Sequence, residues 1–195
     1  MAAPSSKNIG DLTGKWKMNK SQSGALEPVL ALQGIGWLTR KAVGAATFTL
    51  DVKHFNAPPA PPADPSSGPV SHIEIDQLGT GGIKGTTEKR CLDNTFREHS
   101  DWLFGSVKGQ SRWLDVEDID DAYLKAGFLE GDEEKGGPNG EKHIISYVES
   151  LDRGWTATQI WGFKNIEGER KYVRNVVVAK GDERVEVQLV YDFVE

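Results

Sequence analysis

The chain contains a single cysteine, Cys91, among its 195 residues. One thiol forms no internal disulfide and no cysteine-rich metal site, which indicates a reducing compartment. The N-terminal stretch MAAPSSKNIGD lacks the apolar core of a signal peptide, and no run approaches the roughly 18 apolar residues that cross a bilayer. We therefore predict a cytoplasmic protein without stable membrane insertion.

Basic residues are fewer than acidic residues. The chain has 23 Lys and Arg residues against 29 Asp and Glu residues, which gives a net charge of −6. Binding to nucleic acid phosphates requires a surplus of Lys and Arg on one face of a protein. Nucleic acid is therefore not the predicted partner, although a local basic patch is compatible with this charge.

The sequence signatures of common catalytic sites are missing as well. The chain contains no GxSxG, P-loop, GxGxxG or HExxH motif. The acidic residues at 118–121 lack the glycine and the terminal glutamate of a calcium-binding EF-hand loop. Cys91 has no assignable histidine beside it, because the four histidines are scattered: His54, His72, His99 and His143. We predict no metal site and no cofactor.

What the chain does contain is a series of segments in which apolar and polar residues alternate. Phe48, Leu50 and Val52, for example, are separated by polar residues, a pattern typical of β-strands. Turn sequences such as GTGG, LDN, LDRG and KGDE separate the later segments at hairpin spacing. Ten strands are predicted: 12–20, 47–55, 71–79, 85–93, 95–105, 110–116, 143–150, 156–163, 170–180 and 183–193.

Two short helices are predicted between the first two strands, within residues 26–46. Pro28 suits the first turn of a helix, where its missing N–H costs nothing. Gly34 and Gly36 end this helix, and WLTRKAVGAA forms the second one.

The remaining segments are predicted to be irregular. Residues 1–9 are expected to be disordered, and residues 10–195 to form a single domain. An insertion at 56–69 holds six of the nine prolines, which do not fit a sheet ladder, so an exposed loop is expected. A second insertion, 116–142, begins acidic and ends glycine-rich, with one or two helical turns between.

The order of these elements predicts the fold class. A meander of ten strands without crossover helices closes on itself so that no edge stays exposed. A barrel of ten strands is too wide for its own side chains to fill. We predict an all-β fold, a closed antiparallel up-and-down barrel of about ten strands with a helix-turn-helix lid. Its cavity should accept a ligand of about 300 Å³.

Two short motifs support this fold. GKW at 14–16 lies in the first strand, and GIGWLTRK at 34–41 follows the first helix. These residues resemble the Gly-x-Trp and Gly-x-Gly-aromatic-x-x-Arg-Lys motifs of the intracellular fatty-acid-binding proteins, which belong to the calycin or lipocalin-like superfamily. The helix pair of that family covers one end of the barrel. The resemblance therefore implies ligand contacts for Trp37 and Arg40, the alternative for Arg40 being a solvated helix face.

The resemblance also implies a site for a ligand oxygen. That family binds carboxylates with an Arg on a late strand and an Arg-x-Tyr pair on the last strand. Tyr191 matches the tyrosine, whereas Leu189 stands in place of the paired arginine and is expected to contact the ligand. Arg174 is the candidate for the other arginine, with Tyr172 on the same face. We predict Arg174, Tyr172 and Tyr191 as catalytic residues, unless Arg174 points outward to Glu186.

Aromatic residues are the other candidates for the cavity wall. Their rings offer large, stiff surfaces to polycyclic or polyene ligands. The alternative for each is packing in the core. The predicted ligand contacts are Trp102, Trp113, Tyr147 and Trp161.

Two functions fit these features. One is a non-catalytic intracellular carrier of a fatty acid or a similar lipophilic ligand. The other is an enzyme that cyclises or isomerises a hydrophobic substrate without a cofactor in secondary metabolism, and the chain resembles the small lipocalin-like barrels of fungal pathways. Folding a polyene into a reactive conformer and donating one hydrogen bond to its carbonyl suffices for such chemistry. The missing arginine and the supply of aromatic residues favour this pericyclase-like enzyme.

Overall fold

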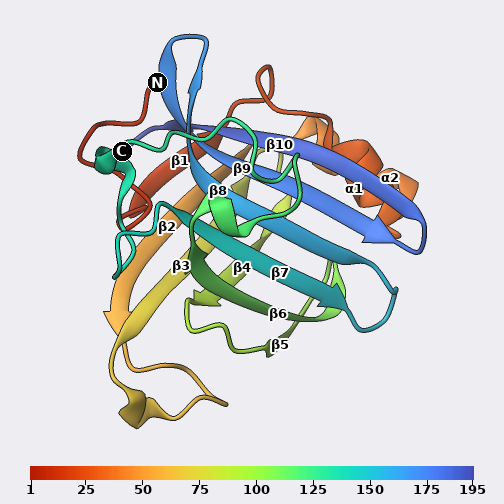
Figure 1. Ribbon diagram of the computed structural model, residues 1–195. Helices are drawn as coiled ribbons and strands as arrows, with labels where there is room; N and C mark the ends of the chain where they lie inside the picture. The colour runs from red at the N-terminus through yellow and green to blue at the C-terminus, as the bar shows by residue number, and fades with distance from the viewer.

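The structure is a computed structural model that describes residues 1–195 except for the side chain of Lys84. Ten antiparallel strands form one sheet that curls into a barrel, and two helices lie over one end (Figure 1). The predicted barrel with its helix pair is confirmed. The elements are β1 (Gly14–Met18), α1 (Leu26–Leu32), α2 (Trp37–Ala45), β2 (Phe48–Ala57), β3 (Val70–Gly79), β4 (Lys84–Cys91), β5 (Arg97–Asp101), β6 (Gly105–Leu114), β7 (His143–Ser150), β8 (Thr156–Ile166), β9 (Glu169–Lys180) and β10 (Glu183–Phe193).

The ring of strands is nearly closed. The strand order runs from β4 through β3, β2, β1, β10, β9, β8, β7 and β6 to β5, so β4 and β5 are the edges. The segment between these two strands pairs elsewhere, because Leu92 N donates to Ser71 O and Asn94 N donates to Ser111 O. In the described part of the chain no backbone ladder joins β4 to β5, which leaves a gap between them.

The interior of the barrel has two apolar parts. One fills the end away from the helices and surrounds Trp16, which is fully buried. It also contains Leu50, Ile75, Trp161 and Tyr172 but no residue of α1 or α2. The other part lies at the helix end, where Val29 and Leu32 of α1 pack on strand residues and on Trp155. The strand residues are Val107, Val148, Ala157, Val176, Val178 and Val187.

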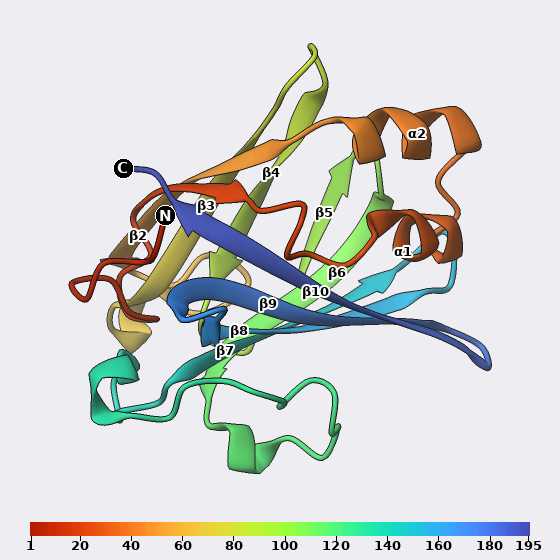
Figure 2. The same ribbon diagram turned by 90° about the horizontal axis from the view of Figure 1, so that it is seen from above.

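The 116–142 insertion covers the outer face of the barrel at β8 and β9. Ile119 and Leu124 pack on Ile160 of β8 and Val177 of β9, and Figure 2 shows the segment running along the outside of the sheet. Asn175 fixes it by donating hydrogen bonds to the carbonyls of residues 123, 124 and 126. Because of this cover, most of β9 is buried on both faces.

The N-terminal segment differs from the sequence-based expectation. Disorder was expected for residues 1–9, whereas Ala3 and Ile9 are buried in the apolar cluster around Trp16. Ala3 N also donates to Arg170 O, at 2.7 Å. Isolated apolar residues such as these have no periodicity, so the sequence pattern alone does not reveal that they pack.

The predicted strand at 95–105 also ends earlier than expected. β5 stops at Asp101, whose Oδ1 accepts hydrogen bonds from the backbone N–H groups of Leu103 and Phe104. This local pairing turns the chain, and Gly105 supplies the positive φ of 73° that the turn requires. Trp102 therefore lies in a turn instead of on a strand face.

No helix in the described residues has the length and hydrophobicity needed to cross a membrane.

Candidate functional site

A cavity of about 450 Å³ lies inside the barrel beneath the two helices. Leu26, Val29 and Leu30 of α1 and Val43 of α2 form its roof. Its side walls are largely apolar and include Phe48, Leu103, Phe104, Val107, Val148, Trp155, Ala157, Val176, Val178, Val187 and Leu189. The cavity exceeds the size expected from the sequence, so a ligand of about 300 Å³ fits inside it.

Polar side chains separate this cavity from the filled end of the barrel. On several strands, one polar residue interrupts the row of inward-facing apolar residues; Ser146, for example, lies between Ile144 and Val148. We call this set the polar layer, and all of its members except Ser146 line the cavity. The polar layer consists of Gln77, Glu88, Arg90, Ser111, Ser146, Gln159 and Arg174.

Arg174 is the most deeply buried charge of the polar layer, with 3% of its surface exposed. Its Cα partners are Leu189 on β10 and Trp161 on β8, so it points inward and not toward Glu186. The guanidinium Nε donates to the Tyr172 hydroxyl at 2.9 Å. Burial disfavours the charged guanidinium, but Tyr172 and the carboxylate of Glu88 outweigh burial and raise the pKa of Arg174. Arg174 therefore stays charged.

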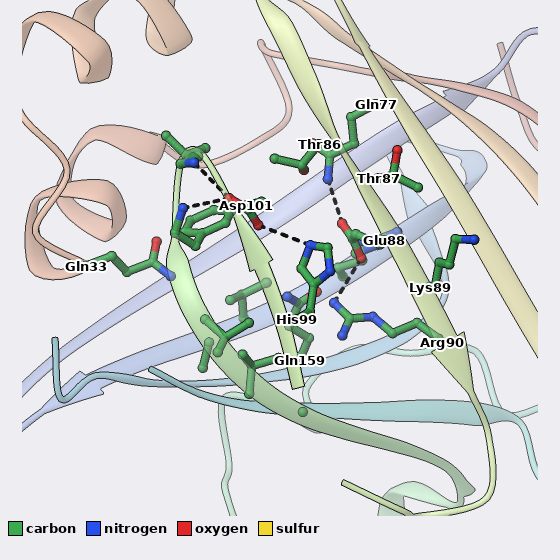
Figure 3. A pocket seen from close by; sticks show the side chains of 18 of the residues that line it. Gln33, Gln77, Thr86, Thr87, Glu88, Lys89, Arg90, His99, Asp101 and Gln159 are labelled. Atoms are coloured by element: carbon green, nitrogen blue, oxygen red, sulfur yellow. Dashed lines mark hydrogen bonds and ion pairs between the residues drawn. The ribbon is translucent and has the colours of Figure 1, made fainter. Parts of the chain in front are cut away.

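Glu88 links the charged groups of the layer. Its Oε1 accepts a hydrogen bond from Gln77 Nε2 at 2.6 Å and lies 3.5 Å from Arg174 Nη1. Its Oε2 accepts from Arg90 Nη2 at 3.1 Å. Figure 3 shows Glu88 between Gln77 and Arg90. Burial opposes ionisation of Glu88, yet Arg174 and Arg90 lower its pKa, so the carboxylate is ionised.

The two tyrosines beside Arg174 are buried and uncharged. Burial is the main cause that raises the pKa of both Tyr172 and Tyr191. Their ring centroids are 5.4 Å apart. Tyr191 lines the cavity, whereas Tyr172 lies behind Arg174 and orients it.

Several buried polar atoms of this layer have no hydrogen-bond partner in the protein. They are Nη2 of Arg174, Nε of Arg90 and the hydroxyl oxygens of Ser111 and Ser146. Buried polar groups in folded proteins are nearly always paired. Arg174, Arg90 and Ser111 line the cavity, so their unpaired donors are candidates to bind the oxygen atoms of a ligand.

The predicted aromatic contacts are mostly outside the cavity wall. Trp102 does line the cavity. Trp113 instead packs near His54, and Tyr147 packs against Phe96 on the outer side of β7. Trp161 lies in the filled end, below Arg174. Tyr147 points outward because side chains alternate along a strand and its neighbours Ser146 and Val148 point inward.

The predicted contacts on the helix pair are also outside the cavity wall. Trp37 is 62% exposed and points away from the interior. Arg40 holds the two helices together, because its Nε donates to Glu27 at 2.9 Å and its Nη1 donates to Ile35 O at 2.6 Å. Arg40 does not line the cavity, and its side chain is largely engaged in these contacts. Leu189, by contrast, lines the cavity.

Sequence reasoning missed Gln77, Glu88, Arg90, Ser111 and Gln159. Their signal is present in the strand pattern, since each shares the face of inward-pointing apolar residues on its own or the neighbouring strand. Charged residues in such a row are unusual unless they are paired. Among the described residues, no group of His, Cys, Asp and Glu side chains is arranged to hold a metal ion. Burial raises the pKa of the Cys91 thiol, which makes it a weak nucleophile.

The chain has the same barrel fold as solved fatty-acid-binding proteins. A fatty acid binding protein of Schistosoma mansoni, solved in complex with arachidonic acid, superimposes with a TM-score of 0.56. The match covers 97% of this chain and 100% of that one, at 14% sequence identity. At this identity the likeness concerns the fold alone.

Two curated proteins are similar to the chain over its full length. The probable pericyclase scpY of Mollisia scopiformis is 31% identical over 195 residues, which span 99% of this chain and 95% of that protein. The pericyclase pydY of an Acremonium species is 29% identical, over 99% and 97% of the two chains. No model of a known protein family matches the sequence. The chain belongs to the family of these pericyclases.

Proposed function

We propose that the protein is a pericyclase that binds an unsaturated, largely apolar molecule in its barrel and promotes the cyclisation of that molecule without a cofactor. The observation that carries this proposal is the cavity, which has apolar walls and a charged floor. Family membership supports the reaction class, since two relatives are named pericyclases. Secondary metabolism is the setting we infer, and the free thiol of Cys91 fits a reducing cytoplasm.

A pericyclic reaction exchanges π bonds for σ bonds within the substrate and needs no external reagent. The contribution of the protein is therefore geometric and electrostatic. Apolar residues such as Val107, Val176 and Leu189 hold the carbon chain in a folded conformer in which the reacting carbons are close together. Arg174 donates a hydrogen bond through Nη2 to a carbonyl oxygen conjugated with the reacting π system, with Tyr191 beside it in the wall.

The alternative is a non-catalytic carrier of a lipophilic ligand. The likeness to a fatty acid binding protein supports this function. A carrier and a pericyclase use the same cavity, so binding alone does not separate them. They differ in whether the bound molecule is converted.

The proposal is tested with a linear triene tethered to an enone, which cyclises slowly by itself. The purified protein should speed up formation of a product of equal mass that has lost the absorbance of the conjugated chain. Heat-denatured protein is the control. Tight binding with no increase over the spontaneous rate would identify a carrier instead.

A further inference from the structure

Arg90 is a charged residue inside the barrel that the predicted site does not include. β4 places Arg90 opposite Ile73 and Glu88 opposite Ile75. Both isoleucines are fully buried in the interior. Directly opposed residues of an antiparallel pair lie on the same face of the sheet, so both charged side chains point inward.

Arg90 reaches across the gap between the two edge strands. It starts on β4, and its Nη1 lies only 3.6 Å from where a Cβ on Gly109 of β6 would be. This distance corresponds to van der Waals contact, so the guanidinium lies against the backbone of β6. Gly109 and Arg90 both line the cavity, so the guanidinium lies at its floor.

The cavity floor carries an excess of positive charge. Arg90 and Arg174 both contact the single carboxylate of Glu88, so the three groups together have a net charge of +1. Each guanidinium also keeps one buried nitrogen without a partner in the protein, Nε of Arg90 and Nη2 of Arg174. Glu88 is shared between two cations and does not satisfy either of them completely.

We propose that Arg90 is a second ligand-contacting cation and that, together with Arg174, it binds an anionic oxygen group of the substrate, such as a carboxylate or an enolate. Leu189 of the last strand lies beside Arg174 in the cavity wall, and Arg90 supplies a second cation from β4. This inference rests on the proposed use of the cavity. The inference adds to the proposed function that the substrate carries a negative charge.

Two fluorescent probes with the same ring system test the inference. 8-Anilinonaphthalene-1-sulfonate carries an anionic group, and N-phenyl-1-naphthylamine is the same molecule without it. Arg90→Met removes the guanidinium but keeps an apolar stem of similar length. Arg184→Met is the matched control, because Arg184 pairs with Asp121 and Glu186 on the outer surface.

We expect Arg90→Met to weaken binding of the sulfonate probe by about tenfold or more, the size of a lost charged hydrogen bond. Binding of the neutral probe should stay within about twofold, as should both probes with Arg184→Met. Glu88→Gln removes the opposing negative charge and leaves one amide oxygen, which accepts from only one of the two guanidiniums. It should therefore bind the sulfonate probe more tightly than the wild type does.

The failure of this inference is distinguishable from failure of the proposed function. If the wild type binds both probes and Arg90→Met binds the sulfonate as tightly as Arg184→Met does, Arg90 contacts no ligand anion. If the wild type binds neither probe, the cavity is not a ligand site and both proposals fail. Should Arg90→Met not fold, the double variant Glu88→Gln/Arg90→Met, which preserves net charge, is compared with Glu88→Gln. The same tenfold loss is expected.

Discussion

The guanidinium of Arg174 lies 4.0 Å from the ring centroid of Trp161, which is itself fully buried. A cation over an indole ring is attracted by the negative face of the ring. Together with the hydrogen bond to Tyr172 and the contact with Glu88, this stacking leaves the guanidinium one orientation. The unpaired Nη2 is therefore fixed in position, as the electrostatic role that we propose for Arg174 requires.

Filling the cavity should abolish binding without unfolding the protein. Ala157 lies on the cavity wall among apolar neighbours, so a phenylalanine there has space to extend into the cavity. We expect Ala157→Phe to weaken binding of N-phenyl-1-naphthylamine by about tenfold or more. The midpoint of thermal unfolding should shift by only a few degrees, because the phenylalanine enters empty space. In a filled core, the same overpacking would destabilise the protein by about 1–3 kcal/mol. Ala157→Val is the control, and unchanged affinity in Ala157→Phe would place the probe elsewhere.

Arg153 holds the helix pair against the barrel. Its Nη1 donates to Gln33 O at the end of α1, at 3.4 Å, and to Leu103 O in the β5–β6 turn, at 3.2 Å. Without this link the helices should open more often, so Arg153→Met should release a bound probe severalfold faster. Stopped-flow displacement of N-phenyl-1-naphthylamine measures this rate. Equal release rates in Arg153→Met and Arg184→Met would show that the contact does not limit exit.

Lys164 should make stability depend on alkaline pH. Its Nζ is buried under the insertion, near the Phe128 ring, and burial lowers the pKa of this amine from 10.5 to about 8. Between these values the unfolded chain binds more protons than the folded chain. The free energy of unfolding therefore gains up to about 1 kcal/mol per pH unit as the pH rises above 8.

Urea unfolding at several pH values checks this effect. The measurements stay below pH 10, where tyrosines ordinarily ionise. Relative to Lys164→Met, which has no amine to titrate, the wild type should become more stable as the pH rises from about 8. If the free energy of unfolding changes equally with pH in the two proteins, the lowered pKa of Lys164 is contradicted.

The barrel could be predicted from sequence because its strands alternate so regularly. Pro28, Gly34 and Gly36 mark the boundaries of the helix pair in the same local way. The gap between β4 and β5 was not predictable, since it depends on Asn94 pairing with Ser111, a contact between distant residues. Local sequence patterns contain no information about such a contact.

The site was predictable only in part. Arg174 and Tyr191 could be placed inside because β9 and β10 have long, regular patterns. Arg90 and Glu88 could not be paired with Arg174, because their strands lie on opposite sides of the sheet order. The alternation pattern predicts a strand face for Trp102, because it does not reveal the hydrogen bonds that Asp101 accepts from Leu103 and Phe104 where the chain turns.

The most direct test of the account is to replace Arg174 by methionine and measure binding and conversion of the triene-enone separately. If the Nη2 donor stabilises the transition state, Arg174→Met should lower the rate at which the bound substrate is converted by about 10²-fold or more. The dissociation constant should change much less, and Arg184→Met should match the wild type in both quantities. A variant that folds, binds and converts the substrate at the wild-type rate would contradict the central claim that Arg174 catalyses the reaction.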